Sequence, residues 1–241
     1  MPNIERTAID FAKRVEAIKN ATVDYVYDLG GNLSRQELAV LVGQLDVTAI
    51  VNELGFVSDV DKLVGRYADV LRGIDPIAPL NEDLLQALVN SDRAFYMSKG
   101  SELAGSMQRE MARGAILGAT RAGMKEVFKE LDGLRPDQVQ TLVDTSMRVF
   151  GREVNLAMTE EFPEDTLYVY VGPADEKTRD LCLRQISAGE MTQAEIIQEF
   201  GSAVLTDGGG YNCRHEWRLS TTAGARMAKK NQAKVEKLAS S

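Results

Sequence analysis

The first two-thirds of the chain repeats its apolar residues at three- and four-residue steps, the spacing of one face of an α-helix. The first such stretch runs to Leu29 and stops at Gly30-Gly31-Asn32. Ser34 and Glu37 then have the spacing of a capping box, in which each side chain accepts the backbone N–H of the other residue. We therefore predict a helix up to Leu29 and a second helix after Ser34, with an apolar stripe that reaches Ile50.

Three further helical patterns follow. One covers about 57–71, and Asn81 is expected to cap the next helix. A long pattern over 101–131 contains several glycines, which either permit close helix packing or act as an assembly hinge, and packing is favoured. The clearest pattern covers 136–161, because it has proline in its first turn, where proline is well tolerated.

The pattern changes after residue 163, where short β-rich and helical segments alternate. The predicted elements are, in order, a strand at Thr166–Val171, a helix that carries Lys177 and Ile186 and stops at Gly189, a helix from a second capping box at Thr192 to Phe200, a flexible loop at Gly208-Gly209-Gly210, and a strand within 211–219. We therefore predict a mostly α protein, with a helical N-terminal region at 1–135, a small α+β domain at 136–220, and a basic tail at 221–241.

The charge of the chain is unevenly distributed. The formal net charge is -8 over 241 residues. The segment 221–241 has five basic side chains and one acidic one, a charge of +4, which leaves -12 for residues 1–220. The acidic body does not favour nucleic-acid binding, whereas the tail either docks on an acidic surface of protein or DNA or is a solvated helix.

The start of the chain, Met1-Pro2-Asn3-Ile4-Glu5-Arg6, lacks the basic and then apolar pattern of a secretory leader. No stretch approaches the roughly 18 apolar residues of a membrane span. We therefore expect a protein that is made in a cytoplasm and has no membrane partner.

Both cysteines, the only histidine and the only tryptophan lie within 182–217. Cys182, Cys213 and His215 supply three of the four ligands of a structural zinc site, and the fourth would be Asp175, Asp180, Asp207 or water. A Cys182–Cys213 disulfide is a second interpretation, although a cytoplasmic product does not favour it. In a third interpretation the two thiols are buried core residues and the histidine bonds a backbone carbonyl.

Asp175 and Arg179 are four residues apart, so on a helix they would face the same way and pair. We expect this pair to be architectural.

The sequence contains few motifs that are typical of enzymes. It has no phosphate-binding loop, no dinucleotide-binding glycine motif and no His-Glu-x-x-His motif. A hydrolase could be built only on Cys182 or Cys213 together with His215, and Cys213 and His215 would share one face of a strand.

The order of motifs in 140–220 is more specific. A helix contains Asp144-Thr145-Ser146-Met147-Arg148 and Asn155, and a β-rich run follows. Asp175-x-x-Thr178-Arg179-x-x-Cys182 comes next, and Asn212-Cys213-Arg214-His215 follows a glycine-rich loop. This order resembles the C-terminal domain of the phage head-morphogenesis family typified by the F protein of phage Mu. Members of that family carry Asp-x-x-[Thr/Val]-Arg-x-x-[His/Cys] and, near the end, Pro-x-Cys-Arg-[Cys/His]. This chain departs from the second element because it has glycine and tyrosine where other members have prolines.

The resemblance implies a minor structural protein of a tailed bacteriophage virion, without enzymatic activity, that acts in head assembly or at the portal. Its expected partners are the portal, major capsid or neck proteins, and the helical region 1–135 is the expected contact part. Two alternatives stay open. One is a metal- or thiol-dependent hydrolase built on Cys182, Cys213 and His215, and the other is an adaptor that contacts packaged DNA through 221–241.

Overall fold

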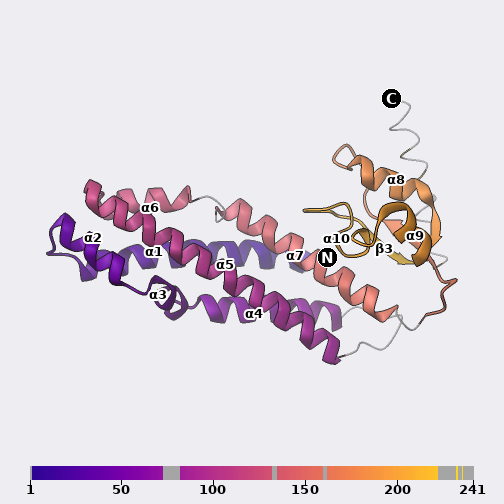
Figure 1. Ribbon diagram of the computed structural model, residues 1–241, viewed down its shortest axis with the longest axis horizontal. Coiled ribbons are helices and arrows are strands. Elements are labelled where there is room, and N and C mark those ends of the chain that lie inside the picture. The colour runs from indigo at the N-terminus through magenta and orange to yellow at the C-terminus, as the bar shows by residue number, and fades with distance from the viewer. Residues whose placement is uncertain are drawn as a thin grey trace. The chain divides into compact units, whose positions relative to one another are not determined.

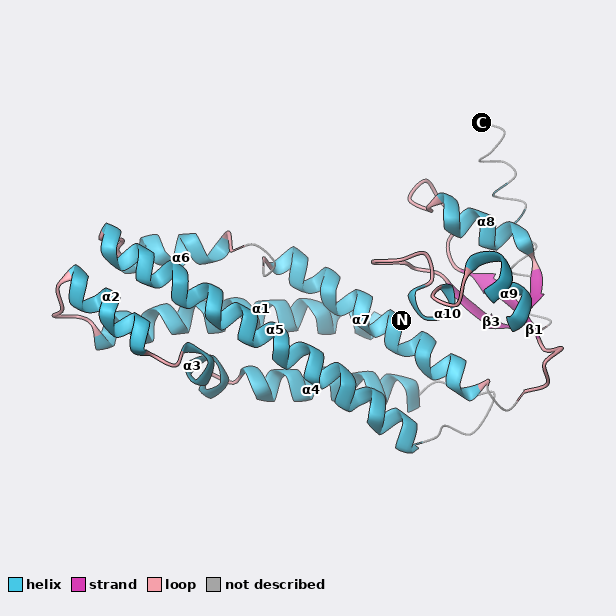
Figure 2. Cartoon of the chain, viewed as in Figure 1, coloured by secondary structure: helices cyan, strands magenta, loops and turns pink. Residues whose placement is uncertain are grey.

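The computed structural model describes residues 2–72, 82–131, 135–159, 162–221, 232 and 235. Helices make up the N-terminal two-thirds, and the strands lie only in the C-terminal part of the described chain (Figures 1 and 2). The predicted class, mostly α with a small α+β C-terminal part, is confirmed. The expected cap at Asn81 and the basic residues of the tail lie outside the described residues.

The chain forms two compact units. One contains Met1–Gly73 and Gln86–Asp144, and the other contains Ile74–Leu85 and Thr145–Ser241. The division falls inside a helix, α7, whereas the sequence places the start of the second domain at residue 136. The helices of the chain up to this point are α1 (Pro2–Leu29), α2 (Arg35–Gln44), α3 (Val47–Glu53), α4 (Phe56–Arg72), α5 (Glu82–Leu117), α6 (Arg121–Lys129) and α7 (Pro136–Met158).

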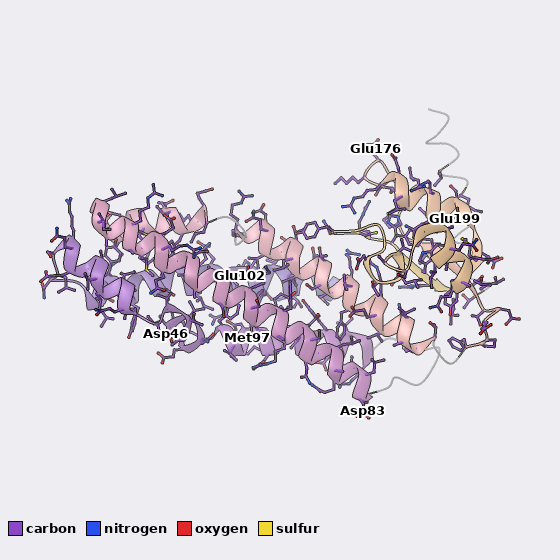
Figure 3. All side chains as sticks on the ribbon, viewed as in Figure 1. Asp46, Asp83, Met97, Glu102, Glu176 and Glu199 are labelled. Carbon is purple, nitrogen blue, oxygen red and sulfur yellow. The ribbon has the colours of Figure 1, made fainter. Side chains whose placement is uncertain are left out.

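Local polar residues set several of these helix boundaries. The Ser34 capping box is present, since its hydroxyl accepts the Glu37 N–H and the Glu37 carboxylate accepts the Ser34 N–H. The apolar stripe predicted to continue to Ile50 is broken, because the Asp46 side chain accepts the Ala49 N–H at 2.9 Å and starts a new helix (Figure 3). Asp46, which lies within the predicted stripe, is thus the N-cap of α3.

The helix predicted over 101–131 is wrong in its bounds. The structure has α5, which begins at Glu82, and a separate α6. Gly118 has φ of +75°, a left-handed conformation that glycine adopts without strain, and it follows directly after α5. Thr120 then caps α6 through the Gly123 N–H. Gly114 shows the expected close packing, because a Cβ there would overlap the end of the Met124 side chain.

The first unit has its core along α1, which packs against α3, α4 and α6. Its buried apolar residues recur at helical spacing: Phe11, Val15, Ile18, Val23 and Val26. Burial of such a stripe supplies most of the stability of an amphipathic helix, at about 25 cal/mol per Å² of apolar surface. In the part of the chain that the structure describes, no helix combines the length and apolarity that a membrane crossing requires.

The second unit contains a three-stranded antiparallel sheet in the order β2-β1-β3. Its elements after α7 are β1 (Leu167–Val171), α8 (Asp180–Ala188), β2 (Glu190–Thr192), α9 (Gln193–Phe200), α10 (Val204–Asp207) and β3 (Glu216–Leu219). The second capping box is present at Thr192 and opens α9. The strand β2 was not predicted, since it has only three residues and leads directly into the capped helix.

The central strand β1 is buried along almost its whole length. Its alternate residues Tyr168 and Tyr170 belong to a core shared with Ile186 of α8, Ile196 of α9 and Trp217 of β3. The Trp217 ring lies against the Tyr170 ring with centroids 5.1 Å apart, and its Nε1–H donates to Gln185 Oε1 at 2.9 Å. This core also contains both cysteines.

We expect Gly100→Ala to lower the free energy of unfolding by about 1–3 kcal/mol, because a Cβ at this position in α5 would overlap the buried Phe56 ring. Gly65→Ala in α4 is the matched control, since a Cβ there meets nothing within 4 Å and should stabilise the helix by about 1 kcal/mol. Urea unfolding followed by far-ultraviolet circular dichroism measures both changes. Equal effects of the two substitutions would contradict the packing of α5 on Phe56.

Candidate functional site

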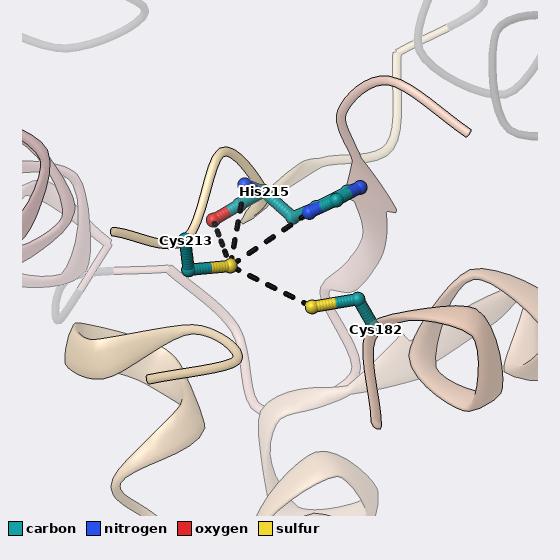
Figure 4. Close-up of side chains that lie close together, drawn as sticks. All are labelled: Cys182, Cys213 and His215. Atoms are coloured by element: carbon teal, nitrogen blue, oxygen red, sulfur yellow. Dashed lines mark hydrogen bonds between the residues drawn. The ribbon is translucent and has the colours of Figure 1, made fainter. Parts of the chain in front are cut away.

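Cys182, Cys213 and His215 come together although the two cysteines are 31 positions apart in the sequence (Figure 4). The two Sγ atoms are 3.6 Å apart, and the Cys213 Sγ is 3.7 Å from His215 Nδ1. All three residues are buried, with relative exposures of 2%, 4% and 3%. Cys182 lies in the first turn of α8, and the other two precede β3. The structure therefore brings residues of the two sequence motifs together at one point.

The His215 ring is held in one orientation. Its Nε2 lies 2.8 Å from the Pro173 carbonyl oxygen, which can only accept a hydrogen bond, so Nε2 carries a proton. The ring also stacks on Tyr170, with centroids 5.5 Å apart and planes 13° apart. Gly172 permits this approach, because a Cβ there would overlap the imidazole. In the neutral ring, Nδ1 therefore presents its lone pair towards Cys213.

Tyr170 is a member of the cluster that the sequence interpretation missed. Its hydroxyl lies 3.6 Å from Cys213 Sγ and 3.8 Å from Cys182 Sγ. Burial, together with the neighbouring sulfurs, raises the pKa of Tyr170 well above its ordinary value. The signal that could have found it is the period of two along β1, which places Tyr168 and Tyr170 on the same face.

The pKa values of the two thiols are shifted in opposite directions. The hydrogen bond from Cys182, aided by the backbone N–H of His215, lowers the pKa of the Cys213 thiol. The same bond to Cys213, together with burial, raises the pKa of the Cys182 thiol. Cys213 is thus the sulfur that favours the thiolate, and Cys182 is the one that keeps its proton.

The glycine segment was predicted as a flexible loop, but its glycines pack tightly on the sulfurs. A Cβ on Gly209 would overlap Cys182 Sγ, and a Cβ on Gly208 would lie 3.1 Å from Cys213 Sγ. Gly208 also has φ of +60° at the end of α10. These positions need glycine because the backbone itself covers the thiols.

Arg152 of α7 is a second residue that sequence reasoning missed. Its side chain is buried, and it donates hydrogen bonds to three backbone carbonyls: Cys213 at 2.7 Å, His215 at 3.0 Å and Thr206 at 3.0 Å. The ion pairs found among the described residues do not include Arg152. A buried cation beside Cys213 favours negative charge on the sulfur cluster.

The predicted Asp175–Arg179 pair is wrong. Asp175 instead accepts two hydrogen bonds from Arg214, at 2.8 and 2.6 Å, and Arg179 donates to the Gly209 and Tyr211 carbonyls. The reason is that α8 begins only at Asp180, because the Thr178 hydroxyl bonds Asp175 and Pro173 in a turn before the helix. Residues 175 and 179 are therefore not on one helix face.

The acidic residues proposed as a fourth ligand do not join the cluster. Among the described residues, the group of potential ligands at this point consists of Cys182, Cys213 and His215, without Asp175, Asp180 or Asp207. The oxygens of Asp175 are committed to Arg214, the Lys177 N–H and the Thr178 hydroxyl. The hydroxyl of Tyr170 is the oxygen that does reach both sulfurs.

The geometry also bears on the disulfide, the hydrolase and the core interpretations of Cys182, Cys213 and His215. The two cysteines are free thiols, since their sulfurs stand at 3.6 Å and a covalent S–S bond is about 2.05 Å. Cys213 and His215 are in contact, as a nucleophile and its base would be, but both are buried beneath the glycine loop. His215 also bonds a backbone carbonyl, as the core interpretation expects.

Comparisons with known proteins do not extend these findings. No family model matches the chain, and no curated protein or solved structure matches it.

We expect Asp175→Asn to destabilise the C-terminal unit and to flatten its dependence on acidic pH. Hydrogen bonds from Arg214, with those from the Lys177 N–H and the Thr178 hydroxyl, hold the pKa of the Asp175 carboxyl well below its ordinary value. The pair therefore stabilises the folded state above the unfolded pKa of about 3.9, and this contribution is lost as pH falls below it.

Urea unfolding at pH 6 and pH 3, followed by the fluorescence of Trp217, measures this effect because Trp217 is the only tryptophan. The wild type should lose stability between these pH values, and Asp175→Asn should be weaker at pH 6 and lose less. Glu176→Gln, a change at the exposed neighbour labelled in Figure 3, should behave as the wild type. An unchanged pH dependence in Asp175→Asn would contradict the role of the pair.

Proposed function

We propose that this chain is a minor structural protein of a tailed bacteriophage particle, acting in head assembly or at the portal. The observation that carries the proposal is that the two motifs on which the resemblance rests form one clamp. Asp175 bonds Arg214, Arg179 bonds the backbone of the glycine loop, and Cys182 meets Cys213. Asp175, Arg179 and Cys182 thus each contact the second motif or the loop that leads to it.

Contacts of this kind support a structural role for the motif residues. The polar groups of the clamp are used within the protein: the Asp175 oxygens bind Arg214, and His215 Nε2 bonds Pro173. The sulfurs are covered by backbone at Gly208 and Gly209. Catalytic groups need access to a substrate, whereas these groups join segments far apart in the sequence. We therefore propose that the chain is not an enzyme.

We place the contact with the portal or capsid in the helical unit. Ile116 and Leu117, at the end of α5, are 64% and 70% exposed. The next residue, Gly118, lies against the Arg35 side chain, and the exposed Leu33 and Val40 flank Arg35 in the sequence. Exposed apolar residues thus lie at the end of α5 and on and beside α2, whose Arg35 contacts Gly118, and exposed apolar residues are typical of surfaces that bind other proteins.

The test is the presence of the chain in purified particles. A phage genome that lacks the gene is complemented with the chain on a plasmid, and density-purified particles are analysed by mass spectrometry and electron microscopy. We expect the wild-type chain at a few copies per particle, with cross-links to portal or capsid proteins, and defective heads without it. A chain that stays in the soluble fraction while normal particles form would contradict the proposal.

We expect the double substitution Ile116→Asp and Leu117→Asp to reduce incorporation at least about tenfold, because it puts charge into an apolar contact. Ile9→Asp, at an exposed apolar residue of α1, is the control and should be incorporated normally. Circular dichroism of the purified variants checks that both fold. Normal incorporation of the folded double variant would place the contact elsewhere on the chain.

A further inference from the structure

We infer that the cluster in the C-terminal unit is a tetrahedral zinc site, formed by Cys182, Cys213, His215 Nδ1 and, as the fourth ligand, the hydroxyl oxygen of Tyr170. The inference does not depend on the proposed virion role. It rests on the spacing of the four donor atoms, on the way the histidine is held, and on the charge around the site.

The spacing of the donor atoms fits zinc. Zn–S bonds of about 2.3 Å and Zn–N or Zn–O bonds of about 2.0 Å give a tetrahedron with edges of about 3.3–3.8 Å. The Sγ–Sγ separation is 3.6 Å, and Cys213 Sγ to His215 Nδ1 is 3.7 Å. The Tyr170 oxygen lies 3.6 and 3.8 Å from the two sulfurs. Four of the six separations between the donor atoms are therefore those that one shared ion requires, and the ligand atoms of Cys182, Cys213 and His215 all lie within 4.8 Å of one another.

The histidine is oriented as a metal ligand. In zinc sites a ligating imidazole usually donates its other ring N–H to a carboxylate or backbone carbonyl, which fixes the tautomer. His215 Nε2–H donates to Pro173 in this way, so the lone pair of Nδ1 is directed at the cluster. The His215 backbone N–H also donates to Cys213 Sγ at 3.4 Å, as expected beside a thiolate ligand.

The charges of the site balance. When Zn²⁺ binds, the protons remaining on the two thiols and on the Tyr170 hydroxyl pass to solvent, which leaves two thiolates, one phenolate and a neutral imidazole. The sum with Zn²⁺ is one negative charge. Arg152 supplies one buried positive charge and bonds the carbonyls of the two ligands Cys213 and His215. The buried guanidinium thus has its counter-charge in the metal site.

Soft thiolates and an imidazole select zinc over magnesium or calcium, which prefer oxygen ligands. The site would join β1, α8 and the segment before β3, so its role is structural. Its ligands come from three places in the chain, and the Tyr170 ligand is one that the sequence motifs do not contain.

The experiment begins with the full-length chain, purified under reducing conditions. Elemental analysis should find about one zinc per chain, and removal with EDTA followed by Co²⁺ should give the intense visible absorption of tetrahedral cobalt with thiolate charge-transfer bands. Zinc should also protect both thiols from alkylation. No bound zinc with two freely alkylated thiols, or a Cys182–Cys213 disulfide in place of metal, would overturn the zinc site.

The fourth ligand is tested by substitution. Tyr170→Phe keeps the ring that packs against Trp217, so it should fold, and we expect its zinc affinity to fall about 10- to 100-fold in competition with a chromophoric chelator. Asp180→Asn, a change at the acid nearest to Cys182 in the sequence, is the control and should bind as the wild type. Full affinity in Tyr170→Phe, or lost affinity in Asp180→Asn, would overturn the assignment of Tyr170.

Cys213→Ser should lose zinc and the cobalt charge-transfer bands. If that variant fails to fold, the cobalt spectra of the wild type and Tyr170→Phe still decide the proposal, because both keep the two thiols. Removal of zinc should lower the thermal transition reported by Trp217 fluorescence and leave the helical unit's circular dichroism in place. A Trp217 transition that is indifferent to zinc would contradict a structural role for the metal.

Discussion

The guanidinium of Arg152 holds the segment of Cys213 and His215 in place, and the rest of the C-terminal site depends on that position. Burying a cation is costly unless it finds hydrogen-bond acceptors. Each of the three nitrogens of this guanidinium donates to one backbone carbonyl, and all three carbonyls belong to the stretch from Thr206 to His215. The stretch has no regular ladder of its own before β3, so these bonds from α7 take the place of a sheet partner.

Around Arg152, glycines pack directly against the sulfur atoms of the two cysteines. Glycine backbone lies directly on the sulfurs, which excludes water without any side chain, and the aromatic rings of Tyr170 and Trp217 close the other side. The outer shell is different in character, since the Asp175–Arg214 pair is partly exposed. Such a pair contributes little by itself in solvent, and its bidentate geometry mainly fixes the direction of the chain.

Much of the fold was predictable because its signals are local. Ser34 and Thr192 each cap a helix with an acid three residues later, and Pro136 starts α7, so a short window contains the whole interaction. Cys182, Cys213 and His215 were singled out because cysteine and histidine are rare in this sequence. The sequence left open whether the three meet, and the structure brings them together.

The wrong or missing site predictions have one physical origin. The contacts of these side chains are made with residues far away in the sequence, which a local pattern does not reveal. Asp175 was paired with Arg179 on the assumption of a helix, whereas a turn at Thr178 delays α8 and Arg214 arrives from 39 residues away. Arg152 lies within the predicted helix 136–161 and Tyr170 within the predicted strand Thr166–Val171, and neither local pattern marks them as members of the site. The role of each depends on the segment around Cys213, which contacts both residues and lies far from them in the sequence.

The long sequence separation between Arg152 and the carbonyls that it binds affects when the C-terminal unit can fold during synthesis. The arginine leaves the ribosome more than fifty residues before the carbonyls of Cys213 and His215 that it binds. The central strand β1 likewise has to wait for β3. Contacts of such long sequence separation form slowly and cannot form on a partial chain. The helical unit, whose α1 and α6 are both complete by residue 129, can therefore assemble during translation, while the C-terminal unit has to wait until β3 has been made.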